Sequence, residues 1–216
     1  MTGSEQQEMS QGEAAYERLL AAIQYGKFQP GDRLREIEVA ASLSLSRTPV
    51  REALRKLESD GIVEHRPRIG AVIRRLSQAE VVELYEMRLV LERTAAEMAA
   101  KHASAAEIDA LEELNEEIGT ATDNAARAAA LNQQFHRGIY LATRNRFLLE
   151  SARALNNALL LLGPTTLADK VRITVVYDQH REIIAALRAA DPQKAGEAAA
   201  VHLETSLRHR LKVMQA

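Results

Sequence analysis

Two short amphipathic helices with a three-residue break between them constrain this chain more than any other feature of its sequence. Apolar residues recur at helical spacing over residues 36–43 and again over 47–57, and residues 44–46 interrupt the pattern. Ser46 is a favourable N-cap for the second helix, and Gly61 is placed to end it. Two short helices joined by so few residues predict a helix-turn-helix.

The segments on either side of this motif complete a small domain. A helix is predicted over 16–25, before the motif, and two short strands are predicted over 62–65 and 71–73, after it. The Pro- and Gly-containing turn between the strands makes them a hairpin, which is expected to form a wing. Residues 1–13 lack apolar periodicity and are expected to be a flexible tail. The first domain is therefore expected to span 14–76.

The rest of the chain, 77–216, is expected to be helical throughout. Ser77 with Glu80, and Ser104 with Glu107, are capping boxes that open helices. Further helices are predicted near 124–142, 146–162, 167–189 and 193–213, the last of them started by Asp191-Pro192. Aromatic residues make up only 4% of the chain, which also favours helices over sheets. The expected fold class is mainly α, an N-terminal winged helix-turn-helix followed by an all-helical bundle.

Composition excludes several classes of protein. The chain has no cysteine, which rules out disulfide frameworks, thiolate zinc fingers and iron–sulfur clusters. No apolar run approaches the roughly 18 to 20 residues that span a bilayer. The polar, acidic start is unlike a signal peptide. We expect a soluble cytoplasmic protein that makes no membrane contact.

Charge is distributed unevenly along the chain. Residues 14–76 hold 12 Lys and Arg against 8 Asp and Glu, whereas residues 77–216 hold 16 against 19. Arg47, Arg51 and Arg55 follow one another at spacing of four on the second helix of the motif, forming a basic stripe beside its apolar face. A solvated charged face would look the same in isolation. Together with the preceding helix and the wing, the stripe favours reading of the DNA major groove.

The first domain contains the string Ser46-Arg47-Thr48-Pro49-Val50-Arg51-Glu52-Ala53-Leu54, with Pro30-Gly31-Asp32-Arg33-Leu34 before it and Asp60-Gly61 and Gly70 after it. With these residues it resembles the winged helix of the GntR family of bacterial transcription regulators. Residues 77–216 resemble the FadR-type C-terminal ligand-binding (FCD) domain of that family, an antiparallel helical bundle. The resemblance implies binding of double-stranded operator DNA. The residues it assigns to DNA contact are Arg35, Ser46, Arg47, Thr48, Arg51, Arg68 and Gly70.

In the bundle, three histidines and one asparagine are candidate metal ligands. Asn132 and His136 share a helix face, and His180 and His202 lie on the last two helices. Imidazoles that converge from different helices can hold a divalent ion, although a histidine taken alone is more often hydrogen-bonded in an ordinary way. The resemblance implies a metal site of one Asp and three His in which Asn132 replaces the Asp. A neutral ligand predicts weaker binding of zinc, nickel or manganese.

Arg88 and Glu92 lie four residues apart and allow two interpretations. They form either an ordinary i,i+4 ion pair or, as the resemblance implies, part of an effector site in which Arg88 binds a carboxylate. Arg88 and Asn132 are the predicted effector contacts, and a small organic acid is the predicted effector. The expected function is that of a homodimeric regulator, a repressor of a palindromic operator. The alternative is a metal-dependent enzyme using the three histidines.

Overall fold

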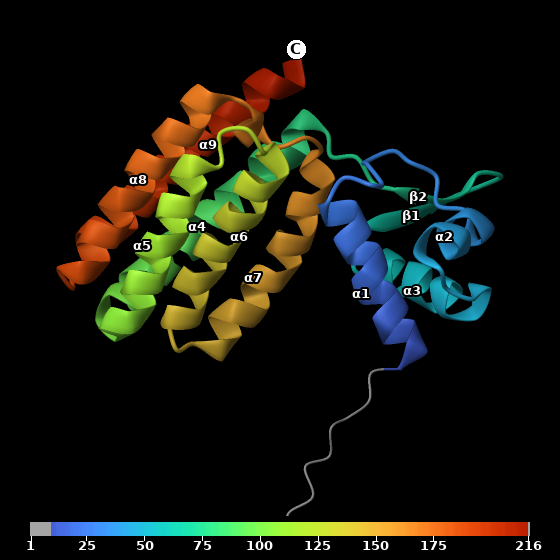
Figure 1. Cartoon of the computed structure of the whole chain (residues 1–216), viewed down its shortest axis with the longest axis horizontal. Helices are drawn as coiled ribbons and strands as arrows, with labels where there is room; N and C mark the ends of the chain where they lie inside the picture. The colour runs from blue at the N-terminus through green and yellow to red at the C-terminus, as the bar shows by residue number, and fades with distance from the viewer. Residues whose placement is uncertain (1–9, 216) are drawn as a thin grey trace, which may run out of the picture. The chain divides into compact units, whose positions relative to one another are not determined.

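The computed structural model describes residues 10–215 of the chain. These residues form two compact units, one of residues 10–75 with 157–163 and the other of residues 76–156 with 164–215. The first unit contains the helices α1 to α3 and both strands, and the second is helical (Figure 1). This element order agrees with the predicted fold class, a winged helix-turn-helix followed by a helical bundle.

The first unit is built on three helices and a hairpin. Its elements are α1 (Gln11–Gln24), α2 (Glu36–Leu43), α3 (Arg47–Ser59), β1 (Val63–Arg66) and β2 (Gly70–Ile73). Helix α3 packs against α1, α2 and β1, so it lies at the centre of the unit. Leu19, Val39, Leu57, Ile62 and Ile73 are fully buried and form the core. The apolar face of α3 faces this core, which leaves its arginine stripe exposed.

Helix α1 begins at Gln11, inside the segment 1–13 that the sequence predicted to be a tail. The Ser10 hydroxyl accepts a hydrogen bond from the Glu13 amide at 3.1 Å, and the Glu13 carboxylate accepts one from the Ser10 amide at 3.0 Å. This capping box starts the helix one turn before the first apolar residue used for the prediction. Residues 1–9 of the predicted tail lie outside the described residues.

The wing is an antiparallel hairpin with a tight turn at its tip. Val63 pairs with Ile73 and Arg66 pairs with Gly70. The Ile69 amide donates to the Arg66 carbonyl at 3.1 Å, and Pro67 and Arg68 occupy the two central turn positions. Arg68 has a φ of +66°, the sign that a type II turn requires at its third residue. The wing therefore holds an arginine where glycine is usual.

The second unit is helical over its described residues. Its elements are α4 (Gln78–His102), α5 (Ala105–Thr120), α6 (Ala125–Ala142), most of α7 (Arg146–Leu159), η2 (Thr166–Ala168), α8 (Lys170–Arg188) and α9 (Pro192–Gln215). The last three residues of α7 and η1 (Leu160–Leu162) belong to the first unit. The predicted capping boxes at Ser77 and Ser104 both form, and Asp191 caps α9 through the Lys194 amide. No helix among the described residues is long and apolar enough to cross a membrane.

Two helix bounds differ from the prediction because of local backbone chemistry. The helix predicted over 146–162 narrows to a 3-10 turn at Leu160 and stops at Gly163, which has a φ of +75° and precedes Pro164. The helix predicted over 167–189 is divided at Asp169, whose side chain caps a new helix through the Val171 amide at 2.9 Å.

Packing in the bundle brings polar side chains into an apolar interior. Helix α4 packs chiefly against α9, α8 packs against α9, and α5 packs against α6 and α8 (Figure 1). Small residues on α4, including Ala95, Ala96 and Ala99, are buried at these contacts and permit close approach of the helices. Buried polar residues from α4, α5, α8 and α9 lie among them, which is the setting of the predicted histidine site.

Candidate functional site

A groove in the first unit gathers most of the predicted DNA-contacting arginines. It has a volume of about 650 Å³ and lies between the start of α2, the exposed face of α3 and the wing. Arg35, Arg47, Arg51 and Gly70 from the predicted set line it, as does Arg55. These residues come from the start of α2, from α3 and from the wing. The fold therefore joins the arginine stripe of α3 to residues of the two neighbouring elements in one basic surface.

Glu36 holds the two arginines in the first part of α3. Its carboxylate accepts hydrogen bonds from Arg51 Nε at 2.8 Å and Arg51 Nη2 at 2.9 Å, and from Arg47 Nη2 at 3.3 Å. The hydrogen bonds from Arg51 are the largest cause that lowers the pKa of Glu36 to about 2; burial opposes them, and the hydrogen bond from Arg47 and the charges of both arginines lower the pKa further. Glu36 is therefore ionised at neutral pH and holds both guanidinium groups at the groove.

The other predicted DNA contacts lie close to this groove. Ser46 is the N-cap of α3, yet its side chain makes no capping hydrogen bond, and both Ser46 and Thr48 are exposed. Arg68 is exposed at the tip of the wing. Hydroxyls at a helix N-terminus and an arginine at a wing tip are suited to phosphate contacts. Their contact with DNA remains a prediction.

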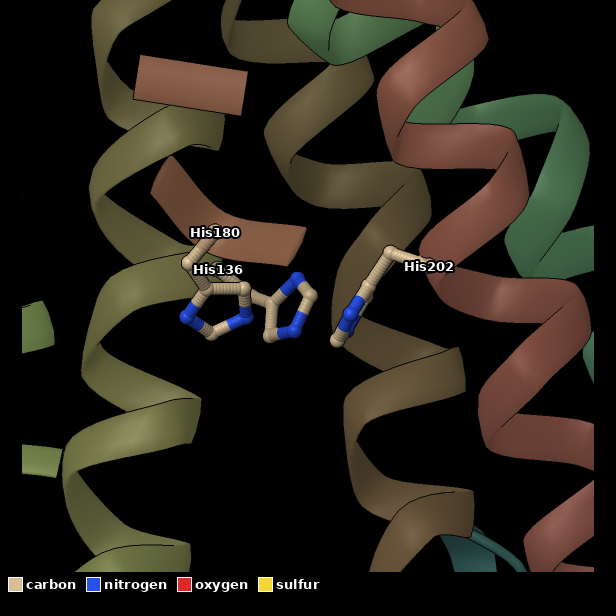
Figure 2. A group of neighbouring side chains, drawn as sticks. All are labelled: His136, His180 and His202. Carbon is tan, nitrogen blue, oxygen red and sulfur yellow. The ribbon is translucent and has the colours of Figure 1, made fainter. Parts of the chain in front are cut away.

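The three predicted histidines come together in the bundle. His136 on α6, His180 on α8 and His202 on α9 each offer one ring nitrogen, and these atoms lie within 4.8 Å of one another (Figure 2). The ring centroids are 4.7 to 5.4 Å apart. Phe135 stacks on the His180 ring at 3.8 Å, which fixes the orientation of that ring.

Hydrogen bonds on the far side of each ring determine which nitrogen carries the proton. Asn115 Nδ2 donates to the Tyr177 carbonyl at 3.0 Å, so its Oδ1 accepts from His180 Nδ1 at 3.2 Å. In the same way, the Gln179 amide nitrogen donates to Thr205 at 3.1 Å, so its oxygen accepts from His202 Nδ1 at 3.2 Å.

The third ring is held by a carboxylate. His136 Nδ1 lies 2.6 Å from Glu92 Oε2, which can only accept when ionised. In its neutral form each of the three rings therefore carries its proton on Nδ1 and leaves a lone pair on Nε2. Nε2 of His136 and Nε2 of His180 are buried and have no hydrogen-bond partner among residues 10–215.

This donor set fits a divalent cation. Metal-binding histidines characteristically donate their second ring N–H to a carboxylate or amide oxygen, the arrangement found at all three rings. Burial, reinforced by the charges of neighbouring groups, lowers the pKa of His180 and of His202 well below the ordinary value. Both rings are thus neutral at pH 7, the form that binds metal. A bound ion would satisfy the orphaned Nε2 atoms and leave coordination positions open for an oxygen ligand.

Arg88 and Glu92 form the ion pair that was one of their two interpretations. Arg88 Nε and Nη2 each lie 2.8 Å from Glu92 Oε1, and both side chains are buried. Burial raises the pKa of Glu92, but Arg88 and His136 outweigh it and hold that pKa below the ordinary value. The charge of Arg88 is thus neutralised within the chain, and its contact with an effector remains a prediction.

The cavity beside the rings is small. It measures about 10 Å³ and is lined by residues that include Glu92, His136, Tyr140 and His202. This volume is about that of one water-sized probe, so an organic effector needs the helices to separate before it can enter. Asn132 lies one turn before His136 on α6, is half-buried, and does not line the cavity. Its predicted roles as metal ligand and effector contact therefore stay predictions.

Sequence reasoning did not identify the residues that orient the site. Asn115, Gln179 and Glu92 each fix one imidazole, and Glu36 fixes the arginines of the groove. Only Glu92 had a sequence signal, its spacing from Arg88, and that signal did not predict its contact with His136. The others act through contacts between distant parts of the chain, which spacing along one helix does not report.

Two family models match the chain. The model described as bacterial regulatory proteins, gntR family, matches residues 11–73, and the FCD domain model matches residues 83–205. A protein of Paenarthrobacter nicotinovorans named "Probable D-xylose utilization operon transcriptional repressor" is 33% identical over 191 residues, covering 88% of this chain and 84% of its own. The HTH-type transcriptional regulator YdhC of Bacillus subtilis is 29% identical over 203 residues, covering 93% and 91%.

Solved structures agree with these matches. The E. coli McbR/YncC structure has a TM-score of 0.83 at 21% identity, over 95% of this chain and 99% of that one, and it supports the fold. A GntR transcriptional regulator from Rhodococcus sp. RHA1 has a TM-score of 0.81 at 25% identity, over 94% and 99%.

The family models and the relatives describe transcription regulators, so the prediction of a regulator rather than an enzyme is confirmed. The alternative of a metal-dependent enzyme has no support from them. The FCD match alone covers more than half of the chain, and the winged helix accounts for most of the remainder. The chain is a DNA-binding transcription regulator and belongs to the GntR family of bacterial regulatory proteins, with an FCD domain at its C-terminal side.

Proposed function

We propose that this regulator is a cytoplasmic repressor that binds a palindromic operator as a homodimer and responds to a small organic acid in its helical unit. A twofold dimer presents two winged helices to two half-sites, which is why an inverted repeat is the expected operator. The repressor name of the Paenarthrobacter nicotinovorans relative supports the sign of regulation. An effector acts by binding one arrangement of the two DNA-reading heads more tightly than another.

We further propose that His136, His180 and His202 hold a divalent metal ion that helps to bind the effector. The observation that supports this most strongly is the buried pair of Nε2 atoms on His136 and His180, which lack a partner while the opposite nitrogens are bonded. An unpaired buried acceptor costs stability, and three lone pairs facing one another repel. When bound, the ion supplies a Lewis-acidic centre for a carboxylate oxygen.

Calorimetric titration of chelator-stripped protein with zinc, nickel and manganese tests the metal site. We expect saturable binding by the wild type and strongly weakened binding by His180→Ala. His102→Gln is the matched control, because His102 is an exposed histidine outside the cluster, at the end of α4. Equal binding by wild type and His180→Ala, or no heat with any of the three metals, would reject the metal.

A gel shift with genomic fragments tests the DNA-binding part of the proposal, and sedimentation of the full chain tests the dimer. The expected result is a retarded complex that forms at a pseudo-palindromic fragment and weakens steeply with salt. A chain that sediments as a monomer at micromolar concentration and still binds the fragment would contradict the homodimer. A chain that binds no fragment would contradict the operator assignment.

A further inference from the structure

Arg172 is a buried cation that forms no ion pair with any of residues 10–215. It lies in the first turn of α8, its side chain is 2% exposed, and it is among the largest fully buried side chains of the described residues. Its Nη2 donates to the Ser206 hydroxyl at 2.6 Å. Its Nε and Nη1 are buried and have no hydrogen-bond partner among the residues that the structure describes.

The contrast with Arg88 is informative because both arginines lie inside the same bundle. Arg88 is paired with Glu92 at 2.8 Å through two nitrogens. Arg172 has a neutral hydroxyl, that of Ser206, as its bonded partner. Burial lowers the pKa of Arg172, since a guanidinium without an acid is disfavoured in an apolar interior. Leaving a buried charge uncompensated is among the costlier arrangements in a folded protein.

Arg172 lies at the N-terminal end of α8. The first turn of a helix carries the positive end of the helix dipole, which disfavours a cation and favours an anion. The carboxylate of Asp169, the N-cap of α8, already lies at this helix end and accepts from the Val171 amide at 2.9 Å, but among the described residues no ion pair joins it to Arg172. A carboxylate can approach a guanidinium along the edge of Nε and Nη2 or along the edge of Nη1 and Nη2. In Arg172, each edge therefore includes one nitrogen, Nε or Nη1, that has no hydrogen-bond partner among the described residues.

Arg172 also lies close to the histidine cluster along the bundle. It precedes His180 by two helical turns on α8, and its partner Ser206 follows His202 by one turn on α9. Helices α8 and α9 pack against each other, and the charge of Arg172 acts on both histidines.

We propose that Arg172 and Ser206 form the carboxylate-binding end of the effector site, in place of the Arg88 assigned from the sequence. This inference rests on the proposed function, because it names the group that would anchor the effector. The ligand class is a small organic monocarboxylate or the carboxylate end of a larger acid. Arg88 then has a structural role, in which it neutralises Glu92.

Formate and acetate are suitable probes because they are the smallest carboxylates. The full chain, stripped of metal by a chelator and without DNA, is melted in increasing formate or acetate against sodium chloride at equal ionic strength. We expect a saturable rise in melting temperature beyond that in chloride. Arg172→Met should weaken the apparent affinity on the order of 10- to 100-fold. Without carboxylate it should melt no lower than wild type, because an unpaired buried charge has been replaced by an apolar chain of similar length.

Two further variants keep the interpretation specific. Arg188→Met removes an exposed arginine from the same helix, with its ion pairs to Asp109 and Glu112, and should leave the carboxylate response unchanged. Arg172→Lys keeps the charge but loses the planar fork, so it should bind formate more weakly than wild type and more tightly than Arg172→Met. The response of the wild-type protein to carboxylates can be measured whether or not any variant folds.

Several outcomes would overturn the assignment. These are a wild-type melting temperature that responds to formate and acetate no more than to chloride, an equal response in Arg172→Met, and stabilisation by inorganic phosphate but not by carboxylates. The experiment uses neither metal nor DNA. A negative result in the metal titration or in the gel shift would therefore not change the result of the carboxylate experiment. A negative result in the carboxylate experiment would likewise not change the results of those two.

Discussion

Replacing Glu92 with glutamine should destabilise the helical unit far more than the same change at Glu97. Both glutamates lie on α4 and both accept from an arginine four residues earlier, at 2.8 Å in Arg88–Glu92 and 3.0 Å in Arg93–Glu97. The pairs differ in burial. The Arg88 and Glu92 side chains are 8% and 9% exposed, whereas those of Arg93 and Glu97 are 51% and 35% exposed.

The expected magnitudes follow from this difference. Removing one partner of a buried ion pair typically costs about 3 to 5 kcal/mol because the other charge is left uncompensated. Glutamine keeps the size of Glu92 and one carbonyl acceptor, so we expect the lower end, about 3 kcal/mol, with the bond from His136 weakened as well. An exposed i,i+4 pair contributes about 0.3 to 0.5 kcal/mol, which is the loss expected for Glu97→Gln.

Urea unfolding of the full chain at pH 7, followed by far-UV circular dichroism after chelator treatment, measures both losses. With a slope of about 2.5 kcal/mol per molar urea, the midpoint should fall by about 1.2 M for Glu92→Gln and by about 0.2 M for Glu97→Gln. Equal midpoint shifts, or a loss below about 1 kcal/mol for Glu92→Gln, would refute the argument that burial makes the first pair important.

Four other outcomes are expected. Arg51→Ala should weaken operator binding in a gel shift by about 1 to 3 kcal/mol while the protein stays folded, and unchanged binding would contradict its assignment to the recognition surface. Arg68→Gly should lower the slope of log K against log salt by about 0.9, because one phosphate contact is lost. Its melting temperature should equal or exceed that of the wild type, because glycine tolerates the positive φ of this turn. An unchanged slope would show that Arg68 does not contact a phosphate. Asn132→Asp should tighten metal binding measured by calorimetry, and equal affinities would show that Asn132 is not a ligand. The metal-free protein should lose stability to urea as the pH falls below about 6.5, because the histidines of the unfolded chain are then protonated whereas His180 and His202 stay neutral in the folded protein, where burial lowers their pKa. His202→Gln should reduce this loss of stability. An unchanged pH dependence in that variant would contradict the reasoning.

Much of the fold was predictable because helix ends depend on local chemistry. The capping boxes at Ser77 and Ser104, and Asp191-Pro192 before the last helix, start helices where the sequence predicted. The start of α1 was missed because its capping box, Ser10 with Glu13, precedes the apolar pattern. Local signals thus locate a helix well when the cap and the apolar repeat begin together.

The grouping of the three histidines was predictable, but the residues that orient them were not. His136, His180 and His202 were placed in one site by resemblance, and the structure brings their rings together. The contact between Asn115 and His180 joins residues 65 positions apart. That Arg172 has no acidic partner among the described residues is likewise a property of the packed interior. Neither follows from spacing on one helix, since each depends on which faces of distant helices meet.

The carboxylate of Glu36 affects how this regulator would search a chromosome. Arg47 and Arg51 are already hydrogen-bonded to Glu36 in the free protein, so if they contact the operator as proposed, DNA must replace that carboxylate as their acceptor. A sequence that offers only scattered phosphates gains little from that exchange, whereas a well-placed guanine gains a paired contact. Competing sites in a genome number about 10⁶ to 10⁹. By weakening non-specific binding, the Glu36 carboxylate would therefore shorten the time that the regulator spends bound to sequences other than the operator.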